Sequence, residues 1–159
     1  METTKTKFPS LRRDYLETLQ INIGYKCNQA CSHCHVDAGP NRTEMMSDEI
    51  INLIPKVIRA NNIKMLDITG GAPELHPKFK KLVTEVRSLN VEVMDRCNLT
   101  ILTEPGHENL ASFLSSKKVQ ITASLPCYLK ENVDKQRGIG VFEKSILALR
   151  KLNSYGYGI

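Results

Sequence analysis

Residues 19–34 read LQINIGYKCNQACSHC, a short apolar alternation followed by three closely spaced cysteines. The first five residues alternate apolar and polar side chains and stop at a glycine, which predicts a half-buried strand. Cys27, Cys31 and Cys34 then follow with C-x3-C-x2-C spacing on what we call the cysteine loop, residues 27–34. Three thiols crowded into one short loop suit metal ligation better than disulfide bonds.

Outward from this stretch, the chain alternates strand and helix about four times. Strands are predicted at 19–23, 65–69, 91–95 and 119–123, and helices at segments that begin near Ser47, Pro77, Leu110 and Gly140. Repeated strand–helix units predict an α/β fold with a parallel sheet and right-handed crossovers, either a partial barrel or a doubly wound sheet. Four strands cannot close a barrel. We therefore expect a chain truncated at its C-terminus, where residues 155–159 stand in place of a fifth strand.

Two helices carry apolar side chains at helical spacing. Ser47 is a candidate N-cap for the first, and Pro55 is expected to kink or break it because proline lacks the backbone N–H. The predicted buried positions of the two helices are Ile50, Ile54, Val57 and Ile58 in the first, and Phe142, Ile146, Leu149 and Leu152 in the last.

Composition excludes several classes of protein. The 159 residues are 41% hydrophobic and 25% charged, with a net charge of +5. The basic residues are scattered, which does not favour a nucleic-acid partner. The sequence has neither an apolar run of about 18 residues nor the apolar core of a signal peptide, so no membrane span is expected. Cysteines in a chain without an export signal predict reduced thiols and a cytoplasmic location.

The carboxyl ends of parallel strands meet at one edge of a sheet, which is where α/β proteins place their sites. All five cysteines and the pair Gly70-Gly71 follow predicted strands, so we expect them on one face. Three thiolates can hold three corners of a 4Fe–4S cluster and leave the fourth iron open. The alternative is a closed zinc site, with His33 or His35 as the fourth ligand.

Together, the cysteine spacing and the Gly-Gly pair resemble the radical SAM superfamily. Within it, the sequence is similar to arsenosugar biosynthesis radical SAM proteins, in CNQACSHCHVDAGPNR (27–42), TGGAPEL (69–75), DRCNLTIL (95–102) and ASLPCY (123–128). The resemblance implies a partial barrel, with an N-terminal extension over 1–18, an incomplete core over 19–159 and no C-terminal domain. It also implies a 4Fe–4S cluster that cleaves S-adenosylmethionine (SAM) to a 5′-deoxyadenosyl radical, a flavodoxin- or ferredoxin-type electron donor, and a dimethylated trivalent arsenical as substrate.

The resemblance also assigns roles to single residues. Cys27, Cys31 and Cys34 match the cluster ligands, and Gly70 and Gly71 match the glycines that receive the SAM amino group. The other SAM contacts that it implies are Asn98 after the third strand, Ser124 after the fourth, and Arg137. The common Gly-Gly-Glu is here Gly-Gly-Ala, with the acid displaced to Glu74.

Cys97 and Cys127 are not needed for a cluster. One interpretation is that each is a small buried side chain at a strand end. The other is that both thiolates face the cavity and present the arsenical to the adenosyl carbon, because trivalent arsenic is thiophilic. Two other functions stay open: a radical SAM enzyme acting on another small molecule or a peptide, and a non-catalytic module that zinc or an iron–sulfur cluster merely staples.

Overall fold

The computed structural model describes residues 9–12 and 14–158. Its elements, in chain order, are β1 (Thr18–Asn22), α1 (Asp48–Ala60), β2 (Met65–Thr69), η1 (Pro73–Leu75), α2 (Phe79–Ser88), β3 (Glu92–Asp95), η2 (Leu99–Thr103), α3 (Leu110–Ser116), β4 (Gln120–Ile121), α4 (Lys130–Arg137) and α5 (Val141–Ser154). Half of the predicted N-terminal extension over 1–18, namely residues 1–8 and 13, lies outside this description. No helix in the described part is long and apolar enough to cross a membrane.

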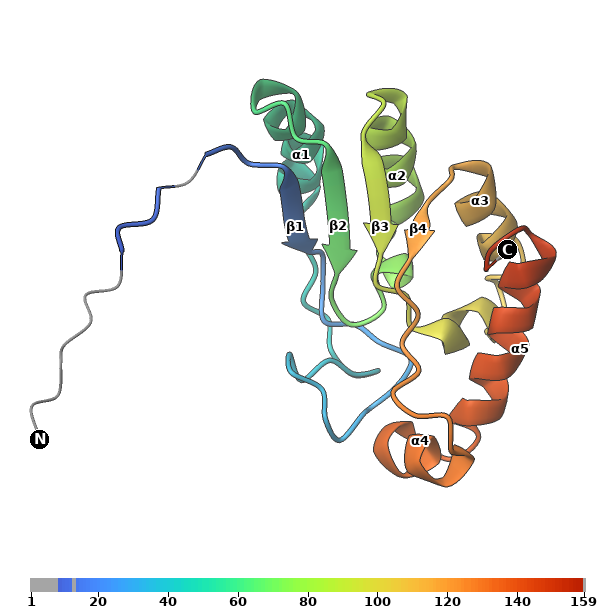
Figure 1. The fold of residues 1–159 in the computed structure, drawn as a ribbon. Coiled ribbons are helices and arrows are strands. Elements are labelled where there is room, and N and C mark those ends of the chain that lie inside the picture. Colours follow the sequence, from blue (N-terminus) through green and yellow to red (C-terminus); the bar gives the residue numbers. More distant parts are fainter. Residues whose placement is uncertain (1–8, 13, 159) are drawn as a thin grey trace, which may run out of the picture.

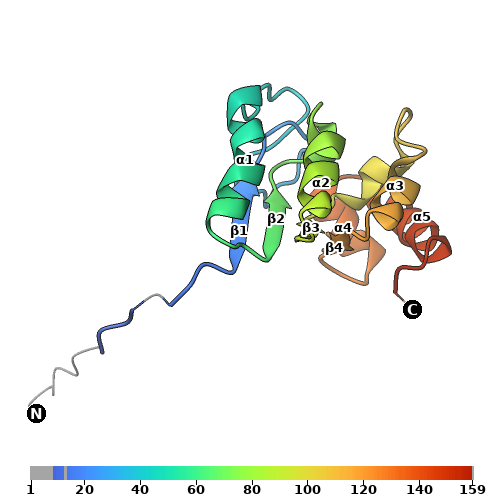
Figure 2. The same cartoon turned by 90° about the horizontal axis from the view of Figure 1, so that it is seen from above.

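The four strands form one parallel sheet in the order β1-β2-β3-β4. Leu19 pairs with Leu66, and Leu66 in turn pairs with Val93. Helices α1 and α2 cover one face of the sheet, while α4 and α5 lie beside the β4 edge (Figures 1 and 2). The predicted α/β architecture with four parallel strands is thus confirmed.

The core lies between the sheet and the helices, and its centre is the contact with α2. Leu66, Ile68 and Val93 point from the strands to the helix layer, where Phe79 and Leu82 meet them, and all five are at most 1% exposed. Full burial of each such side chain contributes about 1.5–3 kcal/mol relative to exposure. This packing fixes the strands, and therefore the place where the loops after them begin.

Helix α1 differs from its prediction in two respects. Its buried residues are Ile51, Ile54 and Ile58, whereas Ile50 and Val57 are 51% and 40% exposed. The helix also continues through Pro55 without a break. Buried isoleucines on both sides of Pro55 hold the helix to the sheet, which outweighs the hydrogen bond that proline cannot donate.

The C-terminal third also departs from the prediction. Strand β4 is only two residues long, and α4, which buries Val133 and Arg137, was not predicted because it has no apolar stripe. Helix α5 fully buries Val141, Ser145, Ala148 and Leu152. Of the four predicted positions, Leu152 is buried, Leu149 is half-buried and packs against the core, and Phe142 and Ile146 are half-buried. Small side chains at the middle positions allow α5 to pack closely against η2.

Candidate functional site

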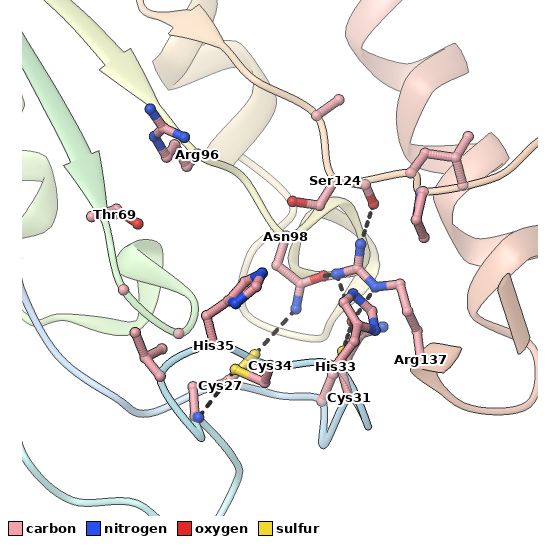
Figure 3. A pocket seen from close by; sticks show the side chains of 18 residues that line it. Cys27, Cys31, His33, Cys34, His35, Thr69, Arg96, Asn98, Ser124 and Arg137 are labelled. Carbon is pink, nitrogen blue, oxygen red and sulfur yellow. Dashed lines mark hydrogen bonds between the residues drawn. The ribbon is translucent and has the colours of Figure 1, made fainter. Parts of the chain in front are cut away.

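The site is a cavity of about 520 Å³ at the carboxyl ends of the strands, which we call the strand-end cavity. Figure 3 shows the cysteine loop on one side of it and the segments after β3 and β4 on the other. Its wall includes eight of the predicted site residues: Cys27, Cys31, Cys34, Gly70, Gly71, Asn98, Ser124 and Arg137. The topology thus brings together side chains that are more than 100 positions apart in the sequence.

The cysteine loop is held from both ends by backbone hydrogen bonds. The Cys27 N–H donates to the Gly39 carbonyl at 3.1 Å, and the Gly39 N–H donates back to Tyr25 at 3.0 Å. The Ala38 N–H donates to the Cys34 sulfur at 3.2 Å. Cys27 is buried, Cys31 and Cys34 are half-buried, and all three are free thiols. The loop therefore presents three sulfurs to the cavity without any disulfide.

Burial raises the pKa of the Cys27 thiol, and hydrogen bonds from the Gln29 backbone and the Asn98 side chain partly oppose that rise. Iron binds the thiolate form, so a positive metal centre has to displace the Cys27 proton. The Gln29 N–H and the Asn98 amide, which already donate to the Cys27 sulfur, would then stabilise its thiolate.

The three loop sulfurs are not gathered as closely as the ligands of a formed zinc site. Around a zinc ion with bonds of about 2.3 Å, tetrahedral thiolates lie roughly 3.8 Å from one another. Among the described residues, the trio whose donor atoms all lie within 4.8 Å of one another is Glu74, Asp95 and Cys97, not the three loop cysteines. Wider spacing suits a cluster, in which each thiolate binds a different iron. His33 and His35 also line the cavity, on the exposed part of the loop.

Gly70 and Gly71 lie so close to the backbone of residues 24–26 that no side chain fits at either position. A Cβ on Gly71 would lie 2.4 Å from the Lys26 carbonyl oxygen, and one on Gly70 would lie 2.5 Å from the Gly24 carbonyl oxygen. The Gly71 N–H already donates to Gly24 at 2.9 Å. The pair therefore docks the chain just before Cys27 onto the end of β2. The backbone carbonyl oxygens of Gly70 and Gly71 are the atoms of this pair that can accept hydrogen bonds from an ammonium group.

Arg137 and Asn98 form a buried polar network behind the cysteine loop. Arg137 donates from Nη2 to Gln29 Oε1 at 3.0 Å and to Asn98 Oδ1 at 3.1 Å, and from Nη1 to the Ser124 carbonyl. Asn98 in turn donates to the Cys27 sulfur at 3.4 Å. The Cys97 N–H donates to the Thr122 carbonyl at 3.1 Å, and the Ser124 N–H donates to the Cys97 carbonyl at 3.2 Å. These bonds continue the β3–β4 pairing beyond the strands and so place these groups side by side.

The expectation that Cys97 and Cys127 face the cavity is wrong. Cys97 is fully buried on the helix side of the sheet beside Glu74 and Asp95, and burial raises its pKa well above the ordinary value. Cys127 is half-buried but is not part of the cavity wall. Its sulfur accepts hydrogen bonds from the Leu129 N–H, which lowers its pKa, and from Asn132.

Glu74 also lies away from the cavity. Its carboxylate oxygens and those of Asp95 are buried and have no hydrogen-bond partner. Burial is the largest cause of the raised pKa values of both acids, and their mutual repulsion adds to that of Asp95. Glu74 is thus not placed to receive the SAM amine.

Gln29 and Arg96 are cavity residues that sequence reasoning missed. Gln29 lies between the first two cysteines and is buried, although nothing in its local sequence signals this. Arg96 also lines the cavity, and its guanidinium binds both carboxylate oxygens of Asp67, with Nη2–Oδ2 at 2.8 Å. Asp67 further accepts from Gln20 at 2.7 Å. The strand alternation that points Asp67 away from the helix layer was the available signal.

Comparisons with known proteins agree with this geometry. The model of the Radical SAM superfamily matches residues 21–159. Two curated relatives, both named "Probable GTP 3′,8-cyclase", come from Saccharolobus solfataricus and Sulfurisphaera tokodaii. The first is 27% identical over 142 residues, or 89% of this chain and 45% of the relative. The second is 27% identical over 77 residues, or 48% of this chain and 25% of the relative.

Solved structures show the same fold. anSMEcpe with bound AdoMet superposes with a TM-score of 0.70 at 24% identity, covering 89% of this chain and 41% of that one. Streptococcus suis SuiB bound to S-adenosylmethionine gives 0.69 at 16% identity, covering 89% and 32%. The chain thus spans less than half the length of these relatives. The family model covers nearly all of the sequence, and the chain therefore belongs to the Radical SAM superfamily, whose enzymes use a 4Fe–4S cluster and SAM.

Proposed function

We propose that Cys27, Cys31 and Cys34 hold a 4Fe–4S cluster with one open iron, and that the strand-end cavity receives SAM against it. The observation that carries this proposal is the convergence of three free thiols and the Gly-Gly pair on one cavity. When bound, the cluster supplies an electron that cleaves SAM to methionine and a 5′-deoxyadenosyl radical.

The role of the cavity residues is then to bind SAM and to orient it. A SAM ammonium would be received by the carbonyl oxygens of Gly70 and Gly71. Ser124, which also lines the cavity, would contact the ribose or the carboxylate. Arg137 is 8% exposed and already bonded to three protein oxygens, so its contribution is positive charge and loop positioning. Arg96 is the more open cation of the wall, with a side chain 45% exposed, and could meet an anionic group of SAM or substrate.

For the substrate, we propose a dimethylated trivalent arsenical joined to the adenosyl group, supported by the resemblance of residues 95–102 and 123–128. The positions of Cys97 and Cys127 give this proposal no geometric support, because neither lines the cavity. A nucleotide is the second candidate. Its support is the name of the curated relatives, together with the cationic Arg96 at the cavity.

The test is SAM cleavage by the anaerobically reconstituted chain with dithionite, followed as 5′-deoxyadenosine by mass spectrometry. We expect cleavage to be lost in Cys31→Ala and kept in Cys127→Ala, the matched control outside the cavity. Dimethylated arsenic(III) and GTP are then offered separately, and an adenosylated arsenical or a cyclised nucleotide identifies the substrate. If the wild-type chain cleaves no SAM, whether it is loaded with iron or with zinc, the non-catalytic module held together by a metal replaces this proposal. A flavodoxin- or ferredoxin-type protein, the electron donor that we propose, is expected to replace dithionite.

A further inference from the structure

The side-chain amide of Asn98 has a fixed orientation. Its Nδ2 donates to the Cys27 sulfur at 3.4 Å and to Asn28 Oδ1 at 2.7 Å, while its Oδ1 accepts from Arg137 Nη2 at 3.1 Å and from the Thr100 hydroxyl at 3.3 Å. Turning the amide over would bring its NH2 group against the guanidinium and its oxygen against an acceptor. Asn98 is 4% exposed, so water does not compete for these bonds.

Arg137 is the anchor of this arrangement. Its acceptors are neutral oxygens of Gln29, Ser124 and Asn98, and within the described residues no carboxylate forms an ion pair with it. A buried cation without a counter-ion is costly. An anionic centre on the neighbouring cysteine loop would offset that cost, and Gln29 ties the guanidinium directly to that loop.

We propose that Asn98 raises the reduction potential of the cluster through its hydrogen bond to the Cys27 thiolate, and that Arg137 is the positioning residue that aims it. This inference rests on the cluster ligation proposed above. In the reduction, one electron passes from the reductant, here dithionite, to the cluster, and no proton or bond is exchanged. The added electron increases negative charge on the ligand sulfurs, so an N–H donor stabilises the reduced state more than the oxidised one.

The size of the effect follows from the hydrogen bond. A bond to a charged acceptor is worth about 1.5–3 kcal/mol, and only part of that differs between the two redox states. Removing it is expected to lower the ratio of reduced to oxidised cluster about three- to tenfold at a fixed applied potential. A tenfold change corresponds to about 59 mV for a one-electron couple.

The experiment is an anaerobic redox titration of the reconstituted chain, followed by electron paramagnetic resonance. Asn98→Ala should lower the midpoint potential by that amount. Arg137→Lys keeps the positive charge but loses the planar fork that aims the amide, so a shift in the same direction is expected. The matched control is Asn132→Ala, which removes an amide–sulfur hydrogen bond of 3.5 Å at Cys127, away from the cluster. Its potential should equal that of the wild type.

Thr100→Val is the milder variant, because it leaves Asn98 and its bond to Cys27 in place. It removes the hydroxyl that donates to Asn98 Oδ1 and accepts from Asn28 Nδ2 at 2.9 Å, so a smaller shift in the same direction is expected. If Asn98→Ala fails to assemble a cluster, the midpoint potentials of Thr100→Val and Arg137→Lys test the inference, and both are expected to be lower than that of the wild type. Wild-type potentials in every variant that holds a cluster would overturn the inference and leave the proposed function standing. A wild-type chain that assembles no cluster, or a Cys27→Ala chain that assembles a normal one, would instead overturn the proposed function.

Discussion

Gly71→Ala should separate the cysteine loop from the end of β2. The added Cβ would lie 2.4 Å from the Lys26 carbonyl oxygen and 2.9 Å from both the Lys26 carbonyl carbon and the Tyr25 carbonyl oxygen. Ordinary contacts of a Cβ begin near 3.4 Å, so the opposing backbone has to retreat by about 1 Å. These atoms are backbone, and no side chain can turn away to relieve the overlap. Overpacking of this kind costs about 1–3 kcal/mol.

The same shift reaches the site itself. The bonds from Gly71 N–H to Gly24 and from Ala72 N–H to Lys26, both 2.9 Å, hold the chain just before Cys27. We therefore expect Gly71→Ala to lower both the free energy of unfolding and the iron bound after reconstitution. Urea unfolding and iron analysis measure the two quantities on the same preparation.

Gly39→Ala is the matched control, because a Cβ there meets no heavy atom within 4 Å. Its free energy of unfolding should stay within about 1 kcal/mol of the wild type, since a glycine replaced without strain changes stability little and often raises it. Equal stability and equal iron content in Gly71→Ala and Gly39→Ala would refute the reasoning about the close approach.

Three further predictions concern stability and the corrected cysteines. Burial raises the pKa values of Asp95 and Glu74. Their contribution to the free energy of unfolding is therefore complete below about pH 4 and is lost as the pH rises through their folded-state pKa values. The loss is at most about 1.4 kcal/mol per pH unit for each group. Asp95→Asn should therefore flatten the fall in urea midpoint between pH 4 and pH 8, and an unchanged slope would contradict the raised pKa. Ser47→Ala removes the N-cap bond of α1, Ile50 N to Ser47 Oγ at 3.4 Å, and should lower the free energy of unfolding by about 1 kcal/mol, measured by urea unfolding against the wild type. Cys97→Ala and Cys127→Ala should each assemble the same amount of iron per chain as the wild type, because neither sulfur reaches the cavity; loss of iron in either would show that the cavity assignment is wrong.

Strand periodicity predicted the strands and the edge where the site forms, because buried alternation is a local property of the sequence. The same periodicity held the signal that would have placed Cys97. Val93 and Asp95 point to the helix layer, and Cys97 keeps their parity, whereas Arg96 and Asn98 line the cavity. The alternation of side chains along the chain therefore distinguishes Cys97, on the helix side, from Asn98, on the cavity side. Their shared position after β3 does not distinguish them.

Other parts of the site could not be predicted from the sequence. Helix α4 has little apolar surface, and it carries Arg137 to a position set by contacts with residues about 100 positions earlier. Gln29 is buried and accepts a hydrogen bond from that arginine. Such tertiary contacts leave no local periodicity in the sequence.

The central claim is that three cysteines hold a cluster with an iron open to SAM. The most direct test is the electron paramagnetic resonance spectrum of the reduced, reconstituted chain, recorded with and without SAM. The account predicts a 4Fe–4S signal that changes when SAM is added and that disappears in Cys27→Ala, Cys31→Ala and Cys34→Ala. A signal indifferent to SAM, or a cluster that survives the loss of one of these cysteines, would contradict it.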